Sequence, residues 1–165
     1  MRAWLKTILA LAAAALAVAL FRALFFTLYT VGGDRFEPVF KAGDRVLVNR
    51  WSFADSVGVG DIVAFDNPAP GGEGVYVCRC AALPGDTVAT PEGTIVVPGR
   101  AATCAPEDYY WMQALGEADT IDSRLFGPVP ESLILGRVCL IVYSHDDSRP
   151  FYTGYRRGRT LLMPY

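Results

Sequence analysis

The sequence predicts a mainly β domain, an antiparallel barrel or sandwich, preceded by one N-terminal transmembrane helix. Three observations lead to this prediction: an unbroken apolar run near the N-terminus, short β-branched and aromatic runs after residue 30, and Gly- and Pro-rich turns between those runs. A chain of 165 residues with 52% hydrophobic and 19% charged residues suits one domain plus a membrane element. The sequence contains no internal repeat and no low-complexity tract.

The first element is an apolar helix that we expect to anchor residues 1–29 in the lipid bilayer. A helix crosses a bilayer with about 20 largely apolar residues. We place the span at about 4–21, with residue 28 as the alternative end, so that the Arg22 side chain reaches the headgroups at the far interface. Arg2 and Lys6 precede the span, and the positive-inside rule therefore predicts a cytoplasmic N-terminus.

A cleavable secretory signal is the alternative interpretation of this segment. Arg2 and Lys6 would form a suitable charged start for such a signal. However, no small-x-small cleavage site follows the apolar run, because residues 25–29 are mostly bulky. We therefore expect the helix to be retained and residues 30–165 to form an extracytoplasmic β domain.

Short strands are expected throughout the β domain. The β-branched or aromatic runs lie at 45–49, 62–65, 75–77, 94–97 and 138–143. Turn-forming residues separate them, for example at 67–72 and 83–86. Many short strands with this punctuation are typical of an antiparallel barrel or sandwich.

The charge balance excludes one large class of function. The formal net charge is −2, whereas a nucleic-acid-binding domain needs a basic face that displaces counterions from phosphates. The densest basic cluster is Arg156-Arg157-Gly158-Arg159, which we interpret as a solvated chain end. Contact with anionic lipid headgroups is the alternative, at roughly 1 kcal/mol per charge. We predict no cofactor.

Four ordered segments of the β domain resemble bacterial type I signal peptidases. Residues 34–50 carry Pro38 and Gly43–Asn49 in register with the family's Ser-Met-x-Pro-Thr-Leu and Gly-Asp-x-Val-Leu-Val-Asn-Lys motifs. The other segments are Gly60–Phe65, Tyr76–Asp86 and Asp122–Pro130. Four matches behind an N-terminal anchor are specific, whereas Leu-Pro-Gly-Asp alone would be weak. The resemblance implies the family's fold, a bacterial inner-membrane location with a periplasmic β domain, and a role in protein export.

The positions that carry catalysis in this family are changed. The family uses a serine nucleophile and a neutral lysine base. Here Arg35 stands at the serine position and Cys78 at the lysine position, and Thr120 replaces a second serine before the last segment. A guanidinium group can neither attack a carbonyl nor give up its proton in a protein. The resemblance therefore implies a pseudoenzyme without catalytic residues.

Residues around the changed positions are interpreted as structural or peptide-binding. The resemblance gives Asp122 and Arg124 as a structural ion pair, with Ser123 a structural neighbour. Family members bind an extended peptide as an added strand, with shallow pockets for small side chains. Phe36 stands where the family's methionine lines such a pocket, and its bulkier ring partly fills that pocket. Tyr76 lies in the strand that matches the family's. Both residues are therefore substrate-binding candidates.

Cys78 is also the first candidate for a relocated nucleophile. A cation at position 35 would favour its thiolate, but we favour a small buried residue on a strand. His145, the single histidine, lies in the polar run Ser144–Asp147, and we interpret it as a surface-loop residue. A histidine base replaces the lysine in eukaryotic relatives, but His145 lies far from that position in the sequence.

The four cysteines leave two states open. Cys78 and Cys80 are two residues apart on a predicted strand, so their side chains share one face. One Cys-x-Cys and one histidine do not predict a metal site. A disulfide is permitted outside the cytoplasm, and Cys104 could reach a strand cysteine. Cys139 is the fourth thiol. One disulfide and four reduced thiols are both compatible with the sequence.

Three functions follow from these residues. The first is a non-catalytic partner of an active signal peptidase. The second is a divergent signal peptidase with residual or relocated activity, for which Cys78 is the first candidate nucleophile. The third is a binding module for exported peptides or envelope proteins.

Overall fold

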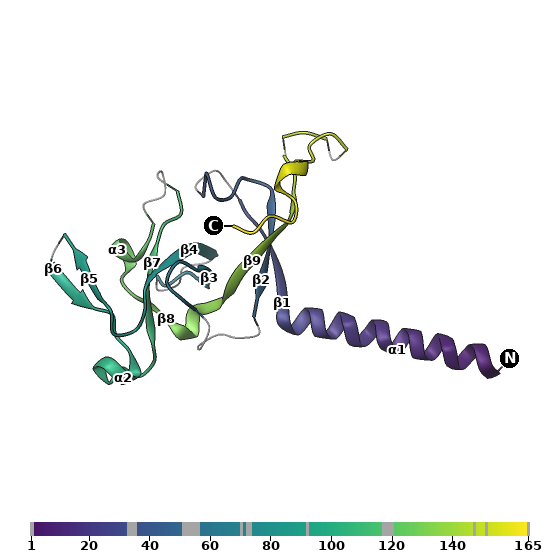
Figure 1. The fold of residues 1–165 in the computed structure, drawn as a ribbon, viewed down its shortest axis with the longest axis horizontal. Helices are drawn as coiled ribbons and strands as arrows, with labels where there is room; N and C mark the ends of the chain where they lie inside the picture. The colour runs from purple at the N-terminus through teal and green to yellow at the C-terminus, as the bar shows by residue number, and fades with distance from the viewer. Residues whose placement is uncertain are drawn as a thin grey trace.

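The computed structural model describes residues 2–32, 36–50, 57–69, 71, 74–91, 93–116, 121–146, 148–150 and 152–164. Helix α1 (Arg2–Phe25) projects away from the β domain (Figure 1). Large apolar side chains along it are exposed, and Leu9 and Leu11 are 71% and 70% exposed. In the described part of the chain, no helix has the length and hydropathy to cross a membrane, so the predicted transmembrane span is not supported.

The helix ends earlier than the predicted anchor. Residues 26–30 form strand β1 (Phe26–Thr30), which pairs antiparallel with β2 (Asp44–Asn49) from Phe26 opposite Asn49 to Thr30 opposite Arg45. Aromatic and β-branched residues suit a pleated, half-buried strand. Cross-strand pairing with β2 therefore overrides the helical continuation that hydrophobicity alone suggests.

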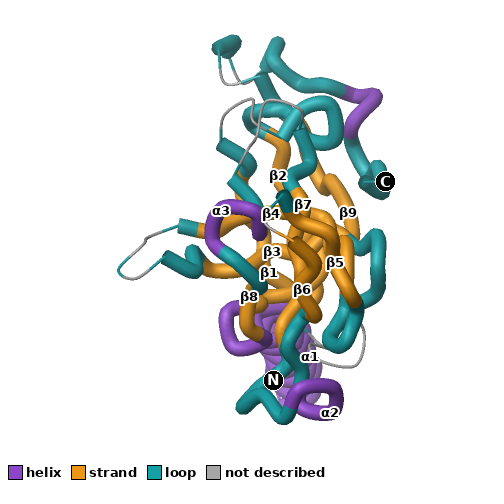
Figure 2. The backbone as a smooth tube through the Cα atoms, turned by 90° about the vertical axis from the view of Figure 1, so that its left-hand side faces the viewer, coloured by secondary structure: helices purple, strands orange, loops and turns teal. Residues whose placement is uncertain are grey.

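One curled sheet of seven strands holds the β domain together (Figures 1 and 2). The strand order is β1, β2, β9 (Ile134–Ser144), β3 (Ile62–Asp66), β4 (Val75–Ala82), β7 (Tyr109–Gln113) and β8 (Val129–Pro130). Every pair of neighbouring strands that the structure describes is antiparallel. The prediction of a mainly β, antiparallel fold is thus confirmed.

The remaining elements that the structure describes are one hairpin and several short helices. Strands β5 (Thr87–Thr90) and β6 (Gly93–Val96) form a separate hairpin at the end of the domain opposite α1 (Figure 1). The short helices are α2 (Arg100–Thr103), α3 (Ser123–Phe126), η1 (Glu131–Leu133) and η2 (Arg157–Arg159). Strands β5, β7 and β8 and these helices were not predicted from the sequence.

The core divides into two main clusters on the two faces of β4. Val77 packs in one cluster with Phe36, Phe40, Val46 and Ile141. Cys78 and Cys80 pack in the other cluster, whose members are Val57, Val63, Phe65, Cys78, Cys80, Tyr110, Met112, Val129 and Ile134. This alternation follows the two-residue period of a strand and confirms that the two cysteines share one face.

Candidate functional site

The segment that matches the family's nucleophile region lies between β1 and β2. Arg35, the predicted replacement of the serine, lies outside the described residues, as does Thr120. Phe36 is buried and begins a turn closed by a 2.9 Å hydrogen bond from the Phe40 amide to the Phe36 carbonyl. The turn returns the chain to the start of β2, where Gly43 N donates to the Val31 carbonyl at 3.0 Å.

A cavity of about 270 Å³ opens beside this turn. Four segments line it: the end of β1 with the residues that follow, the Phe36 turn, β2, and the start of β4. The lining residues are Tyr29, Thr30, Val31, Gly32, Phe36, Val46, Gly74, Val75, Tyr76 and Val77. The structure therefore brings both predicted substrate-binding candidates, Phe36 and Tyr76, to one cavity.

Tyr76 contributes to this cavity only in part. Its ring packs on the opposite side of β4, stacked on Phe65 at a centroid distance of 6.1 Å and 6.5 Å from Phe126. Phe36, in contrast, belongs to the core cluster that also contains Val77. The position of Phe36 makes it the side chain of the pair better placed to limit the size of the cavity.

Cys78 lies on the other face of β4 from Val77 and does not line this cavity. Its side chain is fully buried, and Sγ donates to the Ile121 carbonyl over 3.9 Å. Buried cysteines in apolar surroundings are generally inert. Cys78 therefore packs in the core and lies apart from the cavity that Phe36 lines.

The other thiols are also placed by the structure. Burial, and then the charges of Asp61 and Asp86, raise the pKa of Cys80 to about 11, so this thiol stays protonated at neutral pH. Cys104 is exposed at the end of α2, and Cys139 lies half-buried on β9. All four cysteines lie within the described ranges, and none forms a disulfide.

Asp122, Ser123 and Arg124 connect α3 to β7. The Asp122 carboxylate caps α3 by accepting the Arg124 amide at 2.9 Å, and it accepts Arg124 Nε and Nη2 at 3.0 and 2.8 Å. It also accepts the Ala114 amide at 3.3 Å. Ser123 Oγ accepts the Met112 amide at 2.8 Å in a buried position.

These contacts predict an acid-dependent loss of stability. Burial raises the pKa of Asp122, but the hydrogen bonds from Arg124 and Ala114 outweigh it, and the pKa lies below the ordinary value of 3.8. A lowered carboxyl pKa stabilises the fold above about pH 4 and loses this contribution as pH falls further. We expect Asp122→Asn to destabilise the protein by about 1–3 kcal/mol at pH 7, because the donors lose a charged acceptor.

Urea unfolding at pH 7 and at pH 3 measures this effect. The stability difference between wild type and Asp122→Asn should shrink at pH 3, because the carboxyl group of the unfolded chain, with its ordinary pKa, is largely protonated there and the gain from the lowered folded-state pKa diminishes. Asp66→Asn is the control, since Asp66 is exposed on β3. An Asp122→Asn difference that is equal at both pH values would contradict the stabilising role of the ionised form.

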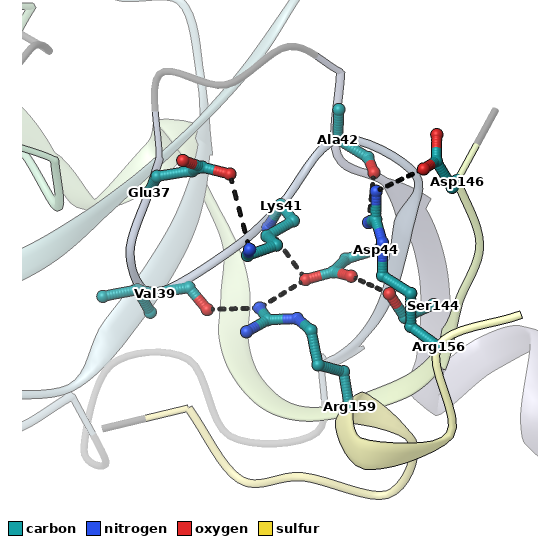
Figure 3. Close-up of polar contacts among 9 residues, drawn as sticks. All are labelled: Glu37, Val39, Lys41, Ala42, Asp44, Ser144, Asp146, Arg156 and Arg159. Carbon is teal, nitrogen blue, oxygen red and sulfur yellow. Dashed lines mark hydrogen bonds and ion pairs between the residues drawn. The ribbon is translucent and has the colours of Figure 1, made fainter. Parts of the chain in front are cut away.

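Sequence reasoning missed a buried carboxylate beside the Phe36 turn. Asp44, at the start of β2, is fully buried and accepts the Lys41 amide at 2.9 Å, the Ser144 hydroxyl, and Arg159 Nη2 at 2.7 Å (Figure 3). Arg159 Nη2 also donates to the Val39 carbonyl at 2.8 Å. The positions of Asp44 and Arg159 are 115 residues apart in the chain, so no local pattern could have paired them.

Two interpretations of the C-terminal part are corrected by this arrangement. Arg156 and Arg159 are not a solvated end: Arg156 Nη1 donates to the Ala42 carbonyl at 2.9 Å, and the Arg159 side chain is only 19% exposed. His145 is not a surface-loop residue, because it is buried with its ring stacked on Tyr143. Gly154 packs so closely on the His145 ring that a Cβ at position 154 would overlap it.

Comparison with known proteins places these features in context. Residues 1–109 match the family described as signal peptidase, peptidase S26. Mitochondrial inner membrane protease subunit 1 of Xenopus tropicalis is 30% identical over 120 residues, which cover 72% of this chain and 70% of that protein. Subunit 1 of the same protease from Schizosaccharomyces pombe is 30% identical over 125 residues, covering 74% and 76%. Signal peptidase I of Bacillus licheniformis is 31% identical over 130 residues, covering 76% and 65%.

Proposed function

Because the chain belongs to the peptidase S26 family of signal peptidases, we propose that it is a catalytically inactive member that binds exported peptides without cleaving them. The single observation that carries this proposal is the pair of residues at the catalytic positions, Arg35 and Cys78. An arginine supplies neither a nucleophile nor a base. Burial of Cys78 among apolar side chains supports the same conclusion.

The cavity beside Phe36 is the proposed peptide site. Its volume of about 270 Å³ lies just below the range of sites for drug-sized ligands and suits one or two small side chains. Val75 and Val77 of β4 and Val46 of β2 give it an apolar lining, while strand backbone on both sides could pair with an extended peptide. Substrate binding can thus persist in a chain that has lost the chemistry.

A substitution that fills the cavity tests whether it is the peptide site. Gly32 lines the cavity, and a side chain added there meets no atom within 4 Å of its Cβ. We expect Gly32→Leu to weaken binding of a fluorescent Ala-x-Ala peptide at least tenfold, because the leucine occupies the space of the peptide side chain. Fluorescence anisotropy with the full-length protein measures the affinity.

Ala101→Leu is the matched control for this experiment. Ala101 is an exposed residue of α2, away from the cavity, and the added side chain is the same. Peptide affinity in this variant should equal that of the wild type. Equal affinities in wild type and Gly32→Leu would show that the peptide binds elsewhere, and absence of binding in the wild type would refute the proposed function.

We further propose that α1 attaches the domain to a membrane. Its exposed apolar side chains, such as Leu9, Leu11 and Leu16, would lie in lipid, and the names of the relatives describe inner membrane proteases. The proposed location is the bacterial inner membrane, with the β domain on its periplasmic face.

An active signal peptidase in the same membrane is the proposed partner. Two relatives are named as subunits of a protease, which supports a subunit role for a member without catalytic residues. Such a member could present a peptide that the active enzyme cleaves. Co-purification of an active signal peptidase with the tagged full-length chain is the expected result.

A further inference from the structure

The last part of the chain returns along the end of strand β9. We call residues 152–164 the C-terminal strap. Backbone hydrogen bonds fix it to β9: Arg156 N donates to the Ser144 carbonyl at 3.0 Å, Leu161 N donates to the Ile141 carbonyl at 2.7 Å, and Ile141 N donates to the Leu162 carbonyl at 2.8 Å. The strap is therefore docked on the sheet at both ends of η2.

From this position the strap reaches the Phe36 turn with two arginines. Arg159 binds Asp44 and the Val39 carbonyl through Nη2, and Arg156 binds the Ala42 carbonyl (Figure 3). Val39 lies in the turn, Ala42 follows it, and Asp44 is the first residue of β2. The strap thus holds the Phe36 turn against the sheet through side chains rather than through strand pairing.

Asp44 joins the strap to the turn through a buried charge. Its carboxylate is fully buried, and it also accepts the Lys41 amide from inside the turn and the Ser144 hydroxyl from β9. Breaking a buried ion pair on one side leaves a charge without compensation, which is more costly than losing an exposed pair. Removal of the Arg159 charge should therefore loosen the turn before it loosens the sheet.

The Phe36 turn forms one wall of the cavity. Phe36 lines the cavity, and the 2.9 Å hydrogen bond from the Phe40 amide to the Phe36 carbonyl connects that wall to the part held by the strap. A shift of the turn would move the Phe36 ring relative to Val46 and Val77, which form other parts of the lining.

We propose that Arg159 is a positioning residue that fixes the Phe36 turn and thereby sets the size of side chain that the cavity accepts. The proposal rests on the proposed peptide site and deepens it by assigning its selectivity to the strap. Arg159 acts through Asp44 and the turn and makes no contact with peptide in this scheme.

Hydrogen exchange of the full-length protein tests the mechanical part of the proposal. In Arg159→Met, which keeps the length and removes the charge, we expect amides of residues 40–43 to exchange at least tenfold faster. Amides of β4 and β7 should keep their wild-type rates. Arg159→Lys restores a donor for Asp44 and should remain within about threefold of the wild type.

Arg157→Met is the matched control, because Arg157 is an exposed residue of the same η2 turn. It should leave exchange of residues 40–43 unchanged. Wild-type exchange in Arg159→Met would overturn the proposal. Faster exchange of β4 and β7 to the same degree would also overturn it, since Arg159 would then support the whole fold, and so would failure of Arg159→Lys to restore protection.

Peptide selectivity tests the functional part. The ratio of affinities for Ala-x-Ala and Ala-x-Leu peptides should fall at least fivefold in Arg159→Met, because a loose turn admits the larger side chain, and Arg159→Lys should restore the ratio. An unchanged ratio with loosened residues 40–43 would overturn the link to selectivity. If the wild type binds neither peptide, the proposed function fails, whereas the exchange rates still decide whether Arg159 positions the turn.

Discussion

Purified full-length protein is expected to leave an Ala-x-Ala precursor uncleaved, with a rate on the order of a millionfold below that of an active signal peptidase. The serine position holds Arg35, whose guanidinium group cannot form an acyl intermediate. Each factor of ten in rate corresponds to about 1.4 kcal/mol of activation free energy. Loss of the covalent acyl-enzyme route alone is enough to raise the barrier by the amount that this rate loss requires. Precursor cleavage followed by gel electrophoresis measures it.

Cys78→Ala is the informative control for this experiment. Cys78 is fully buried and packs with Val63 and Phe65 across the sheet from the cavity, so a precursor bound beside Phe36 would not meet its thiol. The variant should therefore behave as the wild type, with no cleavage in either. Turnover by the wild type that Cys78→Ala abolishes would establish a relocated nucleophile and would refute the assignment as a pseudoenzyme.

Much of the fold could be predicted because its signals are local. The β-branched runs within β2, β3, β4, β6 and β9 alternate or cluster within a few residues, and Gly- and Pro-rich turns separate them. The sidedness of Cys78 and Cys80 follows from the two-residue period of a single strand. Strand β1 was missed because its apolar residues continue the hydrophobic run of α1, and hydrophobicity alone does not distinguish a strand from a helix.

The candidate site was less predictable because its contacts join distant parts of the chain. Motif matches placed Phe36 and Tyr76, and the cavity does contain both. Asp44 lies within one of these matches, but its ion-pair partner Arg159 belongs to the last residues of the sequence. His145 lies among polar neighbours that suggest a surface loop, and it is buried because the strap with Gly154 folds over it. The C-terminal strap thus contacts both residues.

Replacement of Gly136 by alanine is expected to cause a large loss of stability. Gly136 lies in β9 opposite Ala64 of β3, with a φ of +151° that side chains rarely adopt. A Cβ there would overlap the carbonyl oxygen of Asn49 and lie 2.9 Å from Val48 Cγ1. Because the obstacle is backbone of β2, it cannot be relieved by a rotamer change, and we expect a loss of about 4 kcal/mol or more.

Gly93→Ala separates the clash from the backbone strain. Gly93 in β6 has a comparable φ of +138°, but a Cβ there meets no atom within 4 Å. This control should lose only the conformational part, about 1–2 kcal/mol. Urea unfolding followed by tryptophan fluorescence measures both variants. Since a domain of this size has a total stability of about 5–15 kcal/mol, Gly136→Ala should unfold at a markedly lower urea concentration, and equal losses in the two variants would show that β2 and β9 can separate enough to accept a methyl group.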